Sequence, residues 1–330
     1  MNMFSLTDRF SDEARGLRLP QFVVPQRLPS FFADSDKTLL TKEALTEGFT
    51  LRGKDIEIDF SALDAEIARV DIEDSTEASP RAWMLRGKDN EFYRKWFNSL
   101  SSENRIRQCT DIILNQLAKI NAINNKDLSD YTRRVIDMLT PEQLEDLQQS
   151  PLTYSAKIKS KIDGLLDSHR ENVFDLWVEQ GKISCEPRHA LRESISPVKF
   201  TSTIPNSLYT SEEDMNADER EVIWNVVSEG NIRWWHRNIS QTGFNINGYV
   251  NTFPDFIVMT ESGKILMIEP KGWHLDNSDS MHKAKVGRIW QNMANTSGDR
   301  FRYYMVFKFD GFKNKDAVSL ERLLQIVREL

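Results

Sequence analysis

Three charged residues in the last third of the chain have the types and the spacing needed to hydrolyse a phosphodiester. Asp255 lies in one stretch of strand composition, Phe253–Thr260, and Glu269 and Lys271 lie in the next, Lys264–Lys271. Two carboxylates suit a hard divalent cation such as Mg²⁺ or Mn²⁺. A neighbouring lysine can orient a water nucleophile or stabilise a pentavalent phosphate. This chemistry requires all three side chains on one face of a sheet.

The loop between the two stretches determines which residues face each other. Glu261-Ser262-Gly263 is a three-residue loop with glycine last, which suits a type I turn closed by a left-handed residue. Thr260 then faces Lys264, and in the same register Asp255 faces Glu269 with Cβ atoms about 4.5–5.5 Å apart. Like charges in this position destabilise a sheet unless they are compensated. We therefore expect a divalent cation between the two carboxylates.

Lys271 lies two residues beyond Glu269 and therefore points to the same face. The alternative is a surface hairpin with scattered charges, in which the lysine only offsets Glu269. Pro270, between the two, cannot donate to a sheet ladder. Its presence predicts that this strand lies at an edge of the sheet or bulges at the proline.

The surrounding segments predict a mixed α/β fold. Asn216 is placed to cap a helix in which Glu219 completes a capping box. The remaining predicted elements are a strand over Asn231–Ile239, a helix over Asp279–Asn295, a strand over Phe301–Phe309 and a helix over Asp316–Leu330. Upstream, Leu19–Pro25 and Phe49–Phe60 have strand composition, residues 105–180 have helical periodicity, and Thr140 begins one of those helices with a capping box.

Pro254-Asp255 followed by Glu269-x-Lys271 resembles the PD-(D/E)xK nuclease signature. The predicted order of helix, strand, hairpin, helix and strand resembles the α-β-β-β-α-β core of that superfamily. A wider ordered set over about residues 200–310 resembles the C-terminal endonuclease region of type III restriction subunits and of DEAD/DEAH-box helicase–nuclease fusions. Its members are Ser207-Leu208-Tyr209, Asn216-x-x-Glu219, Trp234-Trp235-His236-Arg237-Asn238, Pro254-Asp255-Phe256, Glu269-Pro270-Lys271-Gly272 and His274-Leu275-Asp276.

The resemblance implies roles for the charged residues. Asp255 and Glu269 would bind Mg²⁺ or Mn²⁺, and Lys271 would position the attacking water. The superfamily usually adds an acidic residue on the first core helix, for which Glu219 is the candidate third ligand. The alternative is that Glu219 only caps its helix. Other acidic residues compete for this role: Glu212, Glu213 and Glu221.

Basic residues near the hairpin are candidates for DNA contacts. His236 and Arg237 end the strand that is expected beside the hairpin, and the alternative is that they are ordinary strand-end charges. On the following helix, the resemblance makes Lys283, Lys285 and Arg288 phosphate contacts. The alternative there is a solvated helix face.

The 330 residues carry a net charge of −7, but residues 231–330 carry 14 basic and 10 acidic side chains. An acidic total therefore does not exclude phosphate binding. No apolar stretch is long enough to span a membrane and no signal peptide is visible. Two cysteines 76 residues apart predict neither a disulfide framework nor a zinc site, which is typical of the cytoplasm.

We expect three regions: a β-containing N-terminal region over 1–104, a helical accessory or linker region over 105–200, and a PD-(D/E)xK nuclease domain over 201–330. The predicted function is Mg²⁺-dependent endonucleolytic hydrolysis of DNA in restriction or antiviral defence. No phosphate loop or helicase motif is found, so a helicase or translocase would be a separate domain or subunit. One alternative is a DNA-binding module that does not cleave, or cleaves only with its motor. Another is a structural protein that docks a helicase.

Overall fold

The computed structural model describes residues 2–26, 36–60, 95–117, 120, 122–201, 204–272, 275 and 277–330. Two compact units divide the chain: Met1–Ala44 with Val173–Leu330, here the sheet unit, and Leu45–Asn172, here the helical unit. The division differs from the three consecutive regions expected from the sequence. The beginning of the chain joins the C-terminal part, and residues 45–172 form a unit of their own.

Strand pairing explains why the N-terminal residues belong to the sheet unit. β2 (Arg18–Pro25) lies between β3 (Lys37–Leu39) and β4 (Ser184–Ala190) in an antiparallel sheet. Phe22, for example, pairs with Cys185. The predicted strand at Leu19–Pro25 is therefore confirmed, and its main partner lies in the region that was expected to be a helical linker.

The helical unit confirms the predicted helical periodicity. Its helices are α5 (Ser102–Leu117), α6 (Asn125–Asp137), α7 (Pro141–Gln149) and the first part of α8 (Pro151–Glu179), and α2 (Lys42–Thr46) lies at the unit boundary. The Thr140 side chain accepts a hydrogen bond from the backbone N–H of Gln143, and the Gln143 side chain accepts one from the backbone N–H of Thr140. The predicted capping box is therefore present. Tyr154, Ile158 and Ile162 of α8 are fully buried in the core of this unit.

The strand predicted at Phe49–Phe60 is wrong, because residues 51–60 form no strand. Side chains from the helices bind the carbonyl groups of this segment instead. Tyr131 Oη donates to Asp55 O at 2.9 Å, and Arg134 Nη2 donates to Leu51 O at 2.8 Å. The alternating apolar side chains pack on the helical core rather than on a sheet.

The sheet unit contains a five-stranded mixed sheet in the order β14-β13-β12-β11-β8. The strands are β8 (Ile232–Arg237), β11 (Phe256–Thr260), β12 (Ile265–Lys271), β13 (Phe301–Phe307) and β14 (Ala317–Ser319). β11 is antiparallel to both β8 and β12, whereas β12, β13 and β14 are parallel. The fold is therefore mixed α/β, as predicted.

The predicted hairpin register is confirmed. Phe256 pairs with Ile268 and Met259 with Ile265, and Thr260 N donates to Lys264 O at 3.0 Å. Gly263 has φ of 82°, a left-handed conformation that glycine adopts without steric cost.

The prediction that β12 lies at an edge of the sheet or bulges at Pro270 is wrong, because β13 pairs with it in unbroken register as far as Lys271. Ile265 N donates toward the β13 side, to Arg300 O. Since N–H directions alternate along a strand, the nitrogen of Pro270 faces the β11 side. The pairing of β11 with β12 ends at Phe256 and Ile268. Pro270 lies beyond this pair, so its missing N–H removes no hydrogen bond between the strands. An interior strand tolerates the proline for this reason.

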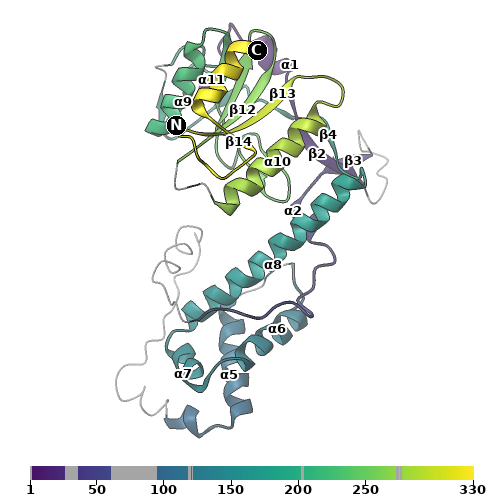
Figure 1. Ribbon diagram of the computed structural model, residues 1–330, viewed down its shortest axis with the longest axis vertical. Helices are drawn as coiled ribbons and strands as arrows, with labels where there is room; N and C mark the ends of the chain where they lie inside the picture. The colour runs from purple at the N-terminus through teal and green to yellow at the C-terminus, as the bar shows by residue number, and fades with distance from the viewer. Residues whose placement is uncertain are drawn as a thin grey trace. The chain divides into compact units, whose positions relative to one another are not determined.

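Helices cover both faces of this sheet, as Figure 1 shows. α9 (Ala217–Ser228) and α11 (Leu320–Glu329) pack on the face that carries Phe256, Val258 and Ile268. α10 (Ser278–Ala294) packs on the face that carries Tyr303. The element order α9-β8-β11-β12-α10-β13 thus places helices on opposite faces around the hairpin.

Short elements complete the sheet unit. They are β1 (Phe4–Ser5), α1 (Ser11–Gly16), β5 (Ser194–Ile195), β6 (Phe200–Thr201), β7 (Glu212–Glu213), β9 (Ile246–Asn247) and β10 (Asn251–Thr252). Within the described ranges, no helix has the length and apolarity that a membrane crossing requires.

Candidate functional site

The hairpin brings Asp255, Glu269 and Lys271 to one end of the sheet. Asp255 directly precedes β11, and Glu269 and Lys271 lie in the last three residues of β12. Asp255 stands opposite Glu269, one step beyond the last paired residues. Lys271 Nζ lies 2.7 Å from Glu269 Oε1, and the two side chains are only 16% and 4% exposed. A carboxylate this deeply buried requires pairing of this kind.

Tyr303 on the neighbouring strand β13 binds the second oxygen of Glu269. Its hydroxyl donates to Glu269 Oε2 at 2.6 Å. Burial, together with the charge and hydrogen bond of Glu269, raises the pKa of Tyr303 well above its usual value. The phenol therefore stays protonated and acts as a donor. Glu269 is thus held by a donor from its own strand and by one from the next strand.

Arg237, at the end of β8, bridges two of the other predicted site residues. Its Nη1 lies 2.9 Å from Asp255 Oδ1, and its Nη2 lies 3.1 Å from Glu219 Oε1. Glu219 Oε2 accepts from Asn216 N at 3.1 Å, which completes the capping box of α9. Glu219 therefore caps its helix and also faces the charged cluster, so the two interpretations of this residue are compatible.

The charges of the cluster perturb one another. The pKa of Asp255 is raised from its usual 3.8 to about 6, mainly because of burial and also by the charges of Glu269 and Glu219, although Arg237 opposes the shift. Burial alone would lower the pKa of Lys271, but the charge and hydrogen bond of Glu269 outweigh it and raise this pKa. At neutral pH the cluster therefore combines a protonated lysine with carboxylates that repel one another.

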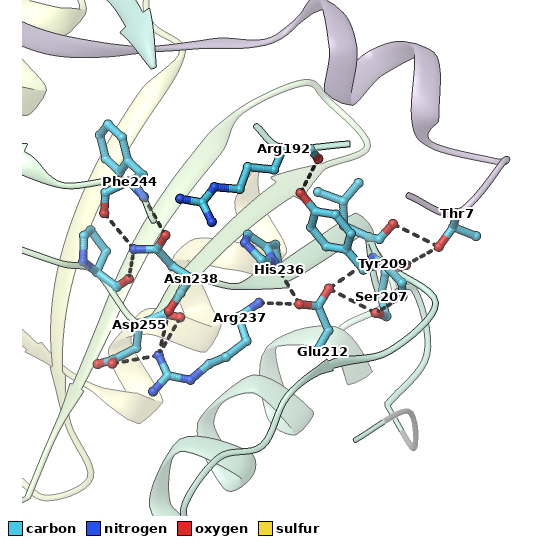
Figure 2. A network of polar contacts seen from close by, with 12 residues as sticks. Thr7, Arg192, Ser207, Tyr209, Glu212, His236, Arg237, Asn238, Phe244 and Asp255 are labelled. Atoms are coloured by element: carbon cyan, nitrogen blue, oxygen red, sulfur yellow. Dashed lines mark hydrogen bonds and ion pairs between the residues drawn. The ribbon is translucent and has the colours of Figure 1, made fainter. Parts of the chain in front are cut away.

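A second buried carboxylate, Glu212, lies close to this cluster (Figure 2). Its Oε1 accepts from Tyr209 N at 3.2 Å and lies 3.1 Å from Ser207 Oγ, whose one hydroxyl proton is shared with Tyr209 O at 2.6 Å. Its Oε2 lies 2.7 Å from His236 Nδ1 and accepts from Arg237 N at 3.1 Å. A carboxylate has about four lone-pair positions, and contacts with four polar groups surround both oxygens of Glu212. Glu212, which competed with Glu219 as a ligand, is therefore bound mainly by groups of the protein itself, including two backbone N–H groups.

Asp255 and Glu269 retain acceptor capacity, which is the condition for binding a metal. Among the described side chains, Glu269 accepts one donor on each oxygen, and Asp255 accepts only Arg237, on Oδ1. No three side chains of His, Cys, Asp or Glu in the described ranges lie close enough together to enclose a metal ion. Mg²⁺ usually keeps several waters and needs only one or two protein carboxylates. Asp255 and Glu269 fit that requirement, and Glu219 is not needed as a third ligand.

Each basic residue that was predicted to contact DNA has a partner within the protein. His236 is 4% exposed and Arg237 is 9% exposed, and both belong to the networks described above. On α10, Lys283 lies 2.7 Å from Asp279 and Lys285 lies 2.7 Å from Asp175, while Arg288 lies 3.0 Å from Asp316. Direct phosphate contacts by the two buried residues would require rearrangement. For the three residues on α10 the role stays a prediction.

The remaining competitors are also placed. Glu221 and Asp218 both bind Lys308 at the end of β13. Burial raises the pKa of Glu213, which lies on the short strand β7. Among the described residues, neither Glu221 nor Glu213 forms a hydrogen bond or ion pair with Asp255, Glu269 or Lys271.

Sequence reasoning missed Tyr303 and did not anticipate that Arg237 bridges two carboxylates. The contact of Tyr303 depends on the parallel register of β12 and β13, in which Met267 pairs with Tyr303. No local pattern encodes that register. The bridge could have been expected. Arg237 ends the strand predicted beside the hairpin of Asp255, and a basic side chain that is buried there must be paired.

Comparison of the chain with protein-family models, with curated proteins and with solved structures gives no match.

Proposed function

We propose that the sheet unit is a PD-(D/E)xK nuclease domain that hydrolyses DNA phosphodiester bonds with Mg²⁺ or Mn²⁺. The observation that carries the proposal is the position of Asp255 opposite Glu269, with Lys271 2.7 Å from Glu269 on the same face. The element order α9-β8-β11-β12-α10-β13 agrees with an α-β-β-β-α-β core. We also propose that the chain acts in restriction or antiviral defence in the cytoplasm, together with a helicase or translocase.

Each residue has a role in this proposal. Asp255 and Glu269 would hold the cation, which when bound supplies Lewis acidity toward the phosphate and a more acidic water. Lys271 has a raised pKa and stays protonated, so it would orient a water oxygen or stabilise charge on the phosphate rather than accept a proton. Tyr303 and Lys271 together would hold the carboxylate of Glu269 in place.

A second candidate function is a DNA-binding module whose cleavage depends on its motor. The bridge from Arg237 to Asp255 and Glu219 favours this alternative. A guanidinium that neutralises one predicted ligand competes with a cation for that carboxylate. DNA or a motor that draws Arg237 away would then switch the site on.

Cleavage of supercoiled and linear DNA tests the proposal. The wild type, Asp255→Asn, Lys271→Gln and the control Lys264→Gln are each incubated with Mg²⁺, Mn²⁺ or EDTA. Lys264 lies in the same hairpin but pairs with Asp299, away from the site. We expect metal-dependent nicking by the wild type and the control, and none by the other two variants. Cutting that survives Asp255→Asn and Lys271→Gln would contradict the proposed site. An inactive wild type that becomes active with a translocating partner would support the motor-dependent function.

A further inference from the structure

We propose that Tyr303 is a positioning residue that fixes the carboxylate of Glu269 for cation binding. This inference rests on the proposed function. The Tyr303 hydroxyl lies 2.6 Å from Glu269 Oε2, and Lys271 Nζ lies 2.7 Å from Oε1. Each oxygen thus holds one donor and keeps one lone-pair position. The two donors come from different strands, which restricts rotation of the carboxylate plane.

The two donors differ in rigidity. Lysine carries its ammonium on a flexible four-carbon stem, whereas tyrosine has only two side-chain torsions and a rigid ring. Tyr303 is 6% exposed, so its ring is enclosed by the protein. Of the two, the tyrosine can define the direction of the carboxylate, and Lys271 can then move toward water or substrate without releasing Glu269.

Helix α10 contacts both the ring and the backbone of Tyr303. A Cβ atom at Gly287 would lie 2.2 Å from Tyr303 Cδ1, so glycine at this position allows the ring to lie against the helix backbone. One turn later, Gln291 Oε1 accepts from Tyr303 N at 2.9 Å. β14 pairs with β13 only from Met305 onward, so this backbone N–H lies beyond the β14 ladder. Gly287 and Gln291 therefore fix both the ring and the backbone of Tyr303.

Loss of a group that orients a metal ligand typically weakens metal binding about 10- to 100-fold. Tyr303→Phe removes only the hydroxyl and keeps the ring. Tyr304→Phe is a matched control, because Tyr304 is the next residue on β13 and packs on the opposite face, in the cluster below α9 and α11. Both variants are expected to fold, since each keeps its aromatic ring.

The experiment is titration of Mn²⁺ into the full chain, followed by calorimetry and by the paramagnetic resonance signal of free Mn²⁺. We expect the Kd for Mn²⁺ to rise about 10- to 100-fold in Tyr303→Phe and to stay unchanged in Tyr304→Phe. Equal Mn²⁺ affinity in both variants and in the wild type would overturn the positioning role while leaving the nuclease proposal intact. A wild type that binds no Mn²⁺ would overturn both.

Discussion

Two buried glutamates of the sheet unit, Glu212 and Glu269, carry the same carboxylate in different surroundings. Glu212 is fully buried, and its two oxygens contact four polar groups, Ser207, Tyr209, His236 and Arg237. Glu269 is nearly as buried, but its described partners are Tyr303 and Lys271, one for each oxygen. A carboxylate with most of its acceptor positions in use stabilises the fold, whereas one with open positions beside a second carboxylate can bind a cation. The number of open acceptor positions, rather than burial, separates the two roles.

The two glutamates also differ in whether their hydrogen-bond donors are backbone groups or side chains. Glu212 accepts hydrogen bonds from two backbone N–H groups, those of Tyr209 and Arg237, so it ties two backbone segments together. Glu269 receives side-chain donors alone among the described residues. Side chains can adjust when a ligand arrives, and backbone groups adjust far less.

Exchange of each glutamate for glutamine gives the largest expected contrast. Glu269→Gln removes the charged ligand, so we expect cleavage to fall by at least about 100-fold while the protein stays folded. Glu212→Gln turns an acceptor into a donor that faces N–H groups, so we expect the free energy of unfolding to fall by about 3 kcal/mol. Urea denaturation and cleavage assays on both variants measure the two effects. If both variants lose the same property, the distinction between the two sites is wrong.

The effect of Asp255 on the free energy of unfolding is expected to depend on pH. Its pKa is raised from 3.8 to about 6 in the folded chain, mainly by burial, so the ionised form costs stability above pH 6. The cost disappears as the pH falls below 4, where the folded and unfolded chains both carry the protonated acid. We expect Asp255→Asn to be more stable than the wild type by about 2 kcal/mol at pH 7.5, after allowance for partial exposure, and equally stable at pH 4.

Urea denaturation of the wild type and of Asp255→Asn across this pH range measures the difference. A difference in the free energy of unfolding that does not change with pH would mean that Asp255 does not titrate near pH 6. Added Mn²⁺ should reduce the difference at pH 7.5, because the cation compensates the ionised carboxylate of the wild type.

The packing of Tyr303 against α10 predicts a smaller effect. Gly287→Ala inserts a Cβ that meets the Tyr303 ring, whereas the same change at Gly298 meets nothing within 4 Å. We expect Gly287→Ala to lower the free energy of unfolding by about 1–3 kcal/mol and to weaken Mn²⁺ binding. Gly298→Ala should change neither property. Thermal denaturation and Mn²⁺ titration of both variants make the comparison, and unchanged Mn²⁺ affinity in a destabilised Gly287→Ala would weigh against coupling of the ring to the site.

The smallest effects are expected for the cations of α10. Lys285 and Arg288 are paired with Asp175 and Asp316, and pairs that are at least partly exposed to solvent contribute about 0–1 kcal/mol to stability. If both side chains leave these partners for DNA phosphates, the double alanine variant should reduce the slope of log affinity against log salt by about 1.8 on duplex DNA. Filter binding over a range of salt concentrations measures the slope. An unchanged slope would assign both residues to the solvated surface.

The local parts of the site could be predicted from the sequence. The loop Glu261-Ser262-Gly263 is short and its glycine is diagnostic, so the register that sets Asp255 opposite Glu269 follows from neighbouring residues. Helix caps such as Asn216 with Glu219 are likewise encoded within four residues. These contacts require no knowledge of distant segments.

The parts that failed depend on distant contacts. Pro270 indicated an edge strand or a bulge, because nothing local reveals that β13 pairs in parallel with β12. The sequence offers His236 as a DNA contact or as an ordinary strand-end charge, but Glu212 of another segment pairs with it inside the protein. Phe49–Phe60 has the composition of a strand, but its apolar residues pack on the helical core instead.

The most direct measurement is an anomalous difference map from crystals of the full chain soaked with Mn²⁺. The proposed site predicts one peak within coordinating distance of carboxylate oxygens of both Asp255 and Glu269, with no Glu212 oxygen among its ligands. Absence of a peak at Asp255 and Glu269, or a peak bound only elsewhere on the chain, would contradict the assignment of this end of the sheet as a metal-dependent nuclease site.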